Sequence, residues 1–147
     1  MPRYFNLEEA RAALPVVGRS IREAVQAKQQ YQEASDLIQQ LAQRILMAGG
    51  MHVDTARTEG WKAQVDSSGQ TLKSAMERIE ELGVLVKDLD TGLVDFPTLF
   101  KGEEVYLCWR MDEADIDHWH GINEGFAGRK AIDRSFVDNH RGGPSFD

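Results

Sequence analysis

Apolar side chains recur along the chain at two different spacings, and the change from one to the other falls near Gly83. Before Gly83 they follow one another in steps of three and four residues, which places them on one stripe of a helix and approaches the heptad pattern of a coiled coil. The stripe therefore predicts helix over most of residues 7–48. Its members there are Leu7, Ala10, Leu14, Val17, Ile21, Ala24, Val25, Tyr31, Ile38, Leu41, Ala42 and Ile45.

This first helical stretch has a marked beginning and an interruption. Asn6 can accept a hydrogen bond from a first-turn amide, and Glu9 can reach back to it in a capping-box arrangement. Pro15 has no N–H to donate to the carbonyl one turn earlier, so it breaks or kinks a helix. We therefore expect a short helix over residues 7–13 and a long one over residues 15–48, about 50 Å in length at 1.5 Å per residue.

A second helical stripe follows a glycine-containing loop and ends at Gly83. Gly69 and the two serines before it weaken this helix, so a bend is expected near residues 67–69. The two long helices form an antiparallel hairpin that buries only one seam, and either the C-terminal half or a second copy of the chain has to cover the remaining apolar surface. We expect a homodimer in a four-helix arrangement. The second stripe consists of Trp61, Val65, Ser68, Leu72, Ala75, Met76, Ile79 and Leu82.

From Gly83 onward, apolar and polar residues alternate as they do in strands. The segment from Asp90 to Gly92 suits a tight hairpin, Pro97 ends the second strand, and Lys101 with Gly102 opens the third. The fold class is therefore α+β: a long antiparallel helical hairpin, coiled-coil-like, followed by a small antiparallel β-meander. The four expected strands cover residues 84–89, 92–96, 104–109 and 115–120.

Three regions result from this pattern. Residues 1–82 hold the helical hairpin with its short first helix, and residues 83–129 form a small β region packed on it. Residues 130–147 are a polar, glycine-containing tail that is ordered only if it docks on something. With 147 residues, of which 41% are hydrophobic, the chain has the size and core content of one ordinary domain.

Charge and cysteine content exclude several classes of partner and compartment. The net charge of −7 lies mostly in the second half, because residues 1–82 carry 10 basic and 11 acidic groups and residues 83–147 carry 7 and 13. Without a local basic stripe, such a surface repels nucleic acid, and it is equally unsuited to an anionic membrane. The apolar runs are far too short to cross a bilayer, and no secretion signal opens the chain. A single cysteine, Cys108, fits a reducing cytoplasm.

Four segments together resemble a known family. They are "YFNLEEARAALP" at the N-terminus, "ELGVLVKDLDTGLVDFP", the strand "EVYLCWR", and "WH" followed by "GFAGR". In this order they resemble the uncharacterised bacterial domain-of-unknown-function family numbered 2203, over nearly the whole chain to about Arg129. The resemblance implies a small cytoplasmic protein with a helical N-terminal half, and it implies no activity. The family pattern shares "WH" and not "HWH", so it selects His120 and leaves His118 as a peculiarity of this chain.

The two histidines around Trp119 are the first candidate for chemistry. In a strand, side chains two residues apart point to the same face, so His118 and His120 can coordinate one divalent metal ion. Alternatively, both imidazoles line a half-buried surface and bond to backbone carbonyls. The third ligand stays open among Asp88, Asp90, Asp95, Glu104, Glu113 and Cys108.

Other polar residues of the β region are weaker candidates. Cys108 alternates with Arg110 on one strand face and would act as a nucleophile only beside a histidine, since a lone strand cysteine is otherwise a small core residue. "EGFAGR" can turn backbone amides toward an anion, with Arg129 as a bidentate partner, or form a structural turn. Asp90 and Asp95 can hold a cation or serve as turn and strand positions.

Two functions remain open on the sequence. In the first, the protein is a non-catalytic interaction or scaffold module that dimerises through its helices and has room for a protein partner. The long, interrupted helical stripe favours this function. In the second, a small-molecule or metal site, of a binding protein or of an enzyme, is built around His120 and Arg129. Its candidate residues are Asp90, Asp95, Cys108, Arg110, His120 and Arg129.

Overall fold

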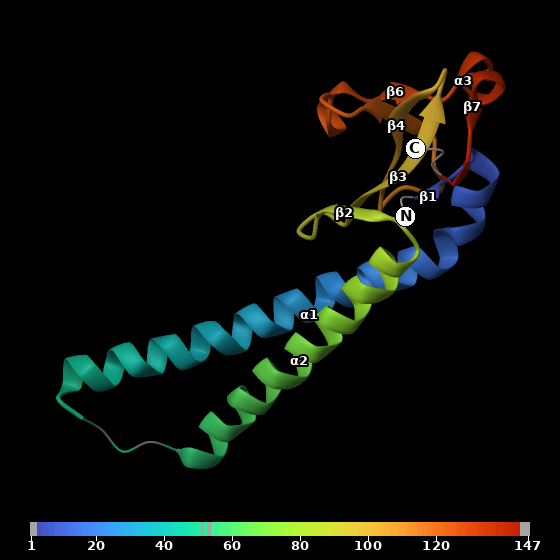
Figure 1. The fold of residues 1–147 in the computed structure, drawn as a ribbon. Coiled ribbons are helices and arrows are strands. Elements are labelled where there is room, and N and C mark those ends of the chain that lie inside the picture. The colour runs from blue at the N-terminus through green and yellow to red at the C-terminus, as the bar shows by residue number, and fades with distance from the viewer. Residues whose placement is uncertain (1–2, 51, 53, 145–147) are drawn as a thin grey trace.

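Two long helices form a hairpin that projects from a β-sheet, as Figure 1 shows for the computed structural model, which describes residues 3–50, 52 and 54–144. Helix α1 spans Leu7–Ala48 and helix α2 spans Thr55–Glu81. The two pack against each other, and an antiparallel sheet follows them in the chain. This confirms the α+β class and the order of helical hairpin and meander.

Local hydrogen bonds explain where the helices begin and end. The Asn6 side chain accepts from the amide of Glu9 at 2.7 Å, and the Glu9 carboxylate accepts from the amide of Asn6 at 3.0 Å, which completes the expected capping box. Helix α1 ends at Gly49, whose φ of 70° is the left-handed conformation that glycine adopts without strain. Helix α2 starts where the Asp54 side chain accepts from the amide of Arg57.

Of the two outcomes predicted at Pro15, a break or a kink, the break is wrong, because α1 continues through Pro15 as one element of 42 residues. The direction of α1 changes within its blue, N-terminal part in Figure 1. Proline costs about 3 kcal/mol inside a helix. Ala10, Val17 and Ile21, on either side of Pro15, are completely buried, and their packing offsets that cost. Helix α2 likewise runs without interruption through residues 67–69.

The described part of the chain forms a six-stranded antiparallel sheet in which five strands follow the order β2-β3-β4-β5-β6. A further strand, β7, pairs with the free end of β3, and a separate short ladder joins β1 to β8. The strands are β1 Arg3–Tyr4, β2 Leu85–Asp88, β3 Leu93–Phe100, β4 Glu103–Arg110, β5 His118–Gly121, β6 Lys130–Ala131, β7 His140–Arg141 and β8 Gly143–Pro144.

Strand β3 passes through Pro97, so the prediction that Pro97 ends the second strand is also wrong. On one side Pro97 lies opposite Tyr106 of β4. On the other side, the pairing with β2 stops at Asp95 and the pairing with β7 starts at Leu99. In this gap the ladder needs no N–H from residue 97, and the carbonyl of Pro97 accepts from the amide of Phe5 at 2.7 Å.

One face of the sheet packs against the hairpin and forms the core. Alternate residues of β3 and β4, namely Val94, Phe96, Leu107 and Trp109, are at most 2% exposed and belong to one cluster with side chains from the helices. This alternation leaves the opposite face of the sheet to a second, more polar set of side chains. The partners in the core cluster are Phe5, Leu7, Ala10, Val17, Ile21, Val25, Ile79, Val84, Val105, Ile116 and Phe136.

Residues 130–144 are integrated into the fold. They form β6, the short helix α3 (Arg134–Asn139), β7 and β8. Phe136 of α3 is 1% exposed and stacks on Phe100 with ring centroids 5.0 Å apart. We expected this tail to be ordered only if it docks on another part of the protein. Through residue 144 it does so.

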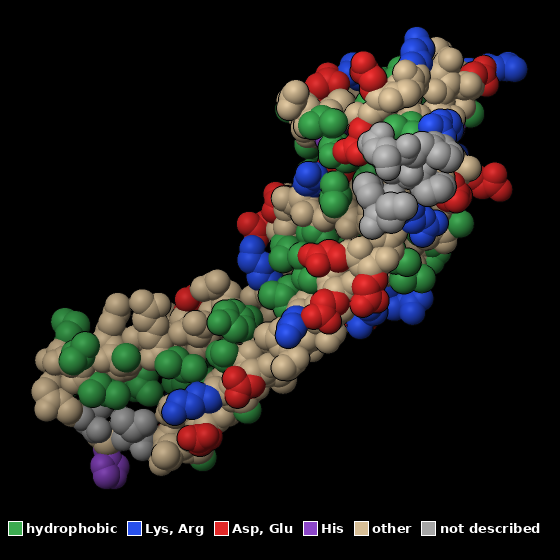
Figure 2. All heavy atoms as spheres, in the orientation of Figure 1, with side chains coloured by type: hydrophobic (Ala, Val, Ile, Leu, Met, Phe, Trp, Pro, Cys, Tyr) green, Lys and Arg blue, Asp and Glu red, His purple; other side chains and the backbone are tan. Residues whose placement is uncertain are grey.

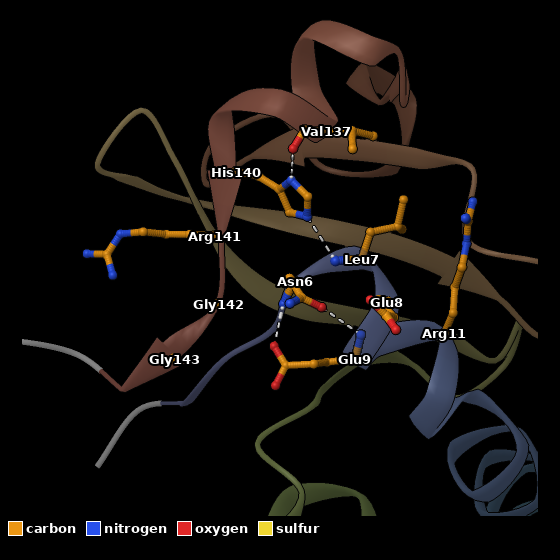
Figure 3. Close-up of a pocket in the computed structure, with 10 residues that line it drawn as sticks. All are labelled: Asn6, Leu7, Glu8, Glu9, Arg11, Val137, His140, Arg141, Gly142 and Gly143. Atoms are coloured by element: carbon orange, nitrogen blue, oxygen red, sulfur yellow. Dashed lines mark hydrogen bonds between the residues drawn. The ribbon is translucent and has the colours of Figure 1, made fainter.

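The C-terminal segment also closes over the beginning of α1 (Figure 3). His140 Nε2 accepts a hydrogen bond of 2.9 Å from the amide of Leu7, while its Nδ1 lies 2.7 Å from the carbonyl of Val137. Gly142 lies so close to the chain that a Cβ atom there would be 2.6 Å from the backbone nitrogen of Asn6. The segment thus supplies an acceptor for a first-turn N–H that α1 cannot satisfy itself.

Candidate functional site

The second face of the sheet carries a compact set of polar side chains. Strand register places Asp95 of β3 directly opposite Cys108 of β4, and Tyr106 of β4 directly opposite His120 of β5. Because residues two apart share a face, all four side chains lie on the side of the sheet away from the helices. Asp95 and Cys108 are each 1% exposed and His120 is 4% exposed.

Asp95 and His120 form a buried hydrogen-bonded pair. His120 Nε2 lies 3.0 and 3.1 Å from the two carboxyl oxygens of Asp95, and Nδ1 lies 2.8 Å from the carbonyl oxygen of Gly121. A carbonyl only accepts, so Nδ1 carries a hydrogen, and one further proton lies between Nε2 and the carboxyl group. Burial raises the pKa of Asp95 above its ordinary value, although the hydrogen bond and charge of His120 oppose this.

Cys108 completes a cluster of three ligand-type atoms. The thiol sulfur of Cys108, a carboxyl oxygen of Asp95 and a ring nitrogen of His120 all lie within 4.8 Å of one another. Burial and the neighbouring Asp95 carboxylate raise the pKa of the Cys108 thiol to about 11, against the opposing effect of the Arg129 guanidinium. The thiol is therefore protonated at neutral pH, which disfavours the role of a free nucleophile.

A small cavity opens beside this cluster. Its volume is about 170 Å³, and Asp95 and His120 contribute to its wall. The segment that follows β5 in the chain also lines the cavity, through Ile122, Gly125 and Phe126. The remaining lining residues are Lys87, Leu93 and Tyr106, with the Lys87 ammonium 5.2 Å from the centre of the Tyr106 ring.

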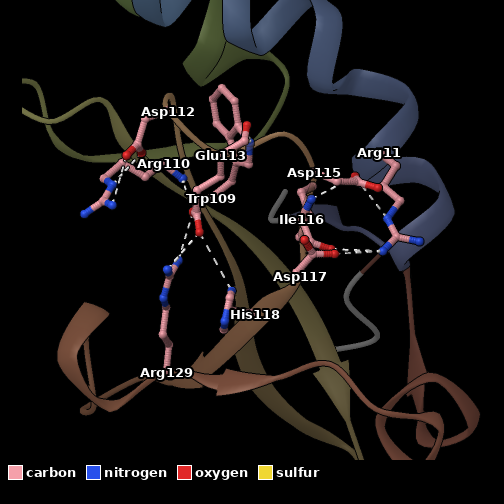
Figure 4. Close-up of polar contacts among 10 residues, drawn as sticks. All are labelled: Arg11, Trp109, Arg110, Asp112, Glu113, Asp115, Ile116, Asp117, His118 and Arg129. Atoms are coloured by element: carbon pink, nitrogen blue, oxygen red, sulfur yellow. Dashed lines mark hydrogen bonds and ion pairs between the residues drawn. The ribbon is translucent and has the colours of Figure 1, made fainter.

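Glu113 organises a second set of polar contacts in the β region (Figure 4). Its two carboxylate oxygens accept from the two terminal nitrogens of Arg129 at 2.9 and 2.8 Å, and Oε1 also accepts from the amide of Arg110 at 2.8 Å. Burial opposes ionisation of Glu113, but these hydrogen bonds and the charge of Arg129 prevail and lower its pKa. The His118 Nδ1 atom, buried and without a hydrogen-bond partner, lies 3.8 Å from Oε2.

Arg110 and Arg129 contact Phe126, in the segment after β5 that lines the cavity. Phe126 lies under the guanidinium groups of Arg129 and Arg110, 4.2 and 4.8 Å from their central carbons. Arg110 also forms two hydrogen bonds with Asp112, at 2.6 and 3.0 Å. Since both guanidinium groups already have carboxylate partners, the described contacts give them a positioning role.

The structure brings some of the candidate site residues predicted from the sequence together and places others apart. It brings Asp95, Cys108 and His120 together, and it places Arg129 next to Cys108. It separates His118 and His120, because one faces Glu113 and the other faces Asp95. Asp90 lies elsewhere, exposed and 2.8 Å from Lys28 of α1.

Two lining residues of the cavity had not been proposed from the sequence. Tyr106 shares the strand face of Cys108, so alternation along β4 was the signal that could have found it. Lys87 lies where the register of β2 with β3 shifts, between Val86 and Asp88, so alternation along β2 did not point to it. Both required the register between strands, which sequence alone does not determine.

A different candidate surface lies at the far end of the hairpin. Among described residues, the last buried side chain of α1 is Ala34 and the first of α2 is Ser68. We call residues 35–48 and 55–67, which lie beyond these positions, the helical arm. Figure 2 shows hydrophobic side chains gathered over it. Leu46 and Met47 are 80% and 90% exposed, and the half-buried seam consists of Ile38, Leu41, Ile45, Trp61 and Val65.

A larger pocket of about 770 Å³ lies between the start of α1 and residues 137–143 (Figure 3). Several of its polar side chains are already engaged: Asn6 with Glu9, His140 with the backbone of Leu7 and Val137, and Arg11 with Asp115 and Asp117. This pocket therefore offers few groups that are free to recognise a ligand.

Comparison with known proteins identifies a family and no characterised relative. A family model described as "Uncharacterized conserved protein (DUF2203)" matches residues 3–132. No curated protein and no solved structure matches the chain. Within the described part of the chain, no helix is both long and apolar enough to span a bilayer.

Proposed function

Because the chain belongs to the DUF2203 family of uncharacterised conserved proteins, whose description supplies no activity, we propose a function from the geometry: an interaction module that forms a homodimer through its helical arm. The observation that carries this proposal is the apolar surface of the arm, whose seam is only half-buried and whose Leu46 and Met47 are exposed. Two helices bury a single narrow seam, and stable helical assemblies cover the remainder with further helices. A second hairpin packed on the first would complete a four-helix arrangement.

Charge favours a second copy as the occupant of this surface. The arm carries three basic and three acidic side chains and is therefore neutral, whereas the whole chain has a net charge of −7. Two copies that meet through their arms avoid placing the acidic remainders of the chains against each other. A two-fold axis would let the same apolar stripe serve on both sides of the interface.

The test is the oligomeric state of a variant that places charge on the arm. Leu46→Glu combined with Met47→Glu changes two exposed side chains and leaves the core untouched. Sedimentation equilibrium should show twice the chain mass of 16.6 kDa for the wild type and the chain mass for the variant. Circular dichroism should show equal helix content in both proteins, because neither substitution removes a buried contact.

Val137→Glu is the matched control, since Val137 is also exposed, at 43%, but lies on α3, away from the arm. This variant should remain dimeric. A wild-type protein that stays monomeric up to roughly 100 µM, a concentration at which even weak specific interfaces assemble, would contradict the proposal.

The proposal includes a cytoplasmic location. Cys108 is a buried free thiol, and reducing compartments keep such thiols from oxidation. Fractionation of cells that express a tagged chain checks this location, and recovery outside the cytoplasmic fraction would count against it.

A further inference from the structure

The buried cluster of Asp95, Cys108 and His120 has the features of a metal centre. We propose that these three side chains bind one Zn²⁺ ion, and that a fourth coordination position opens into the cavity under Ile122 and Phe126. The proposal rests on the β region alone and is independent of self-association through the arm.

The ligand atoms have the right chemistry and approach one another closely. A carboxylate oxygen, an imidazole nitrogen and a thiolate sulfur are the three donor types of protein zinc sites, and this mixed set suits a borderline-soft ion. In a tetrahedral site such atoms lie about 3.3 to 3.7 Å apart, given metal bonds of about 2.0 to 2.3 Å. Here all three lie within 4.8 Å of one another, and His120 Nε2 is 3.0 Å from Asp95.

The imidazole of His120 is held in the orientation that a ligand needs. Its Nδ1–H donates to the carbonyl of Gly121, so Nε2 is the atom turned toward Asp95. Metal-ligating histidines almost always donate their other N–H to a carbonyl or carboxylate, which fixes both ring orientation and tautomer. His118 lacks this arrangement, because it faces Glu113 and its buried Nδ1 has no hydrogen-bond partner.

The charge of the cluster does not change when zinc replaces protons. Without an ion, the cluster holds the thiol proton of Cys108 and the proton between His120 and Asp95, and its net charge is zero. Binding of Zn²⁺ releases these two protons and leaves a thiolate, a carboxylate and a neutral imidazole around a doubly charged ion, again with a net charge of zero. A buried site tolerates this exchange because no uncompensated charge is created.

The cavity identifies the fourth position and limits what occupies it. Structural zinc sites use four protein ligands, whereas sites with three keep a position for water or a substrate. The cavity of about 170 Å³ borders Asp95 and His120 directly. At about 30 Å³ per water molecule, it holds a ligand of only a few heavy atoms. The Lys87 ammonium in its wall favours a small anion over a cation.

Cobalt substitution tests the site on the intact protein. We expect the wild type to bind one Co²⁺ per chain and to show a thiolate-to-cobalt charge-transfer band, with zinc displacing cobalt. Cys108→Ser should abolish this band, and His120→Asn should weaken zinc binding by more than about 100-fold, the upper end of the loss seen when only an outer-shell partner is removed. Azide should shift the visible cobalt bands if the fourth position is open.

His118→Asn is the matched control, because it changes the neighbouring histidine of the same strand and should leave metal content and spectrum unchanged. A folded wild type that binds no cobalt, or binds it without the charge-transfer band, would overturn the assignment, and this result does not depend on whether a variant folds. Equal losses in His118→Asn and His120→Asn would overturn the ligand set. The arm variant Leu46→Glu/Met47→Glu should bind metal normally whatever its oligomeric state.

Discussion

Glu113 is an ionised residue on which several parts of the β region depend. Its carboxylate accepts hydrogen bonds from Arg129 and from the backbone of Arg110. The side chains of Arg129 and Glu113 are only 15% and 18% exposed. The pKa of Glu113 is lowered from its ordinary value of 4.5. The ionised pair therefore stabilises the folded state above pH 4.5, and this contribution is lost as the pH falls through the lower, folded-state pKa.

Glu113→Gln should accordingly lower the free energy of unfolding by about 1 to 3 kcal/mol at pH 7, because Arg129 is left half-buried without its counter-charge. Below pH 4.5 the wild type should lose stability more steeply than the variant, which has no carboxylate to protonate. Urea denaturation between pH 7 and pH 3 measures both effects. Glu103→Gln, at an exposed position, should follow the wild-type pH dependence, and parallel curves for all three proteins would exclude a role for this pair.

At the same scale, only some features of the candidate metal site could be predicted from the sequence. His120 and Cys108 were identifiable as residue types suited to metal binding. The pairing of His120 with Asp95 was not, because it depends on the register of three strands and on which face each side chain takes. The register places His118 opposite Cys108, but its Nδ1 lies 3.8 Å from Glu113 and outside the ligand cluster, so a sequence pattern of two histidines yields one proposed ligand and one neighbour.

At the scale of elements, the first turn of α1 depends on a residue 133 positions away. The amide of Leu7 donates to His140 Nε2, while the capping box of Asn6 and Glu9 satisfies other first-turn groups. His140→Phe keeps a ring that can stack on Phe136 but removes the acceptor. We expect it to reduce the free energy of unfolding by about 1 to 3 kcal/mol, the cost of a buried donor without a partner.

Chemical denaturation at pH 8 measures this loss. His52→Phe provides the control, since His52 lies exposed in the loop between the helices and should leave stability within about 0.5 kcal/mol of the wild type. An unchanged stability for His140→Phe would mean that water replaces the imidazole as the acceptor.

Both prolines illustrate where local rules fail at this scale. The rule for Pro15 is physically sound, but complete burial of Ala10, Val17 and Ile21 around it outweighs the lost hydrogen bond. The rule for Pro97 holds for strands paired on both edges, and it fails because no strand pairs with β3 at that point of one edge. In each case the deciding arrangement, burial around Pro15 and strand pairing around Pro97, depends on residues far away in the chain, which the pattern around the proline does not reveal.

At the scale of the whole molecule, Phe136 ties the C-terminal segment to the sheet. It packs against Phe100 and Trp119, with ring centroids 5.0 and 4.8 Å away, and belongs to the main core. Phe136→Ala should cost about 3 to 5 kcal/mol, as for other large aromatic residues removed from a core. Val137→Ala, the neighbouring exposed position, should cost less than about 0.5 kcal/mol in the same thermal unfolding measurement.

The expected helices and meander followed from periodicity, because each long segment repeats its apolar spacing many times. The role of residues 130–144 could not be predicted from periodicity, because Phe136 is one aromatic residue in a polar stretch and no repeat marks it as buried. The family match ends at residue 132, before this segment completes the core and caps α1.

The short ladder between β1 and β8 brings residues 3–4 beside residues 143–144, at the end of the molecule opposite the tip of the arm (Figure 1). Residues 3 and 144 therefore lie at the same corner of the β region. A fluorophore or affinity handle fused at either position reports on the same neighbourhood and leaves the arm unobstructed. A label at Gly49 or Gly50 marks the tip alone, so a donor at one site and an acceptor at the other measure the distance between the β region and the tip of the arm.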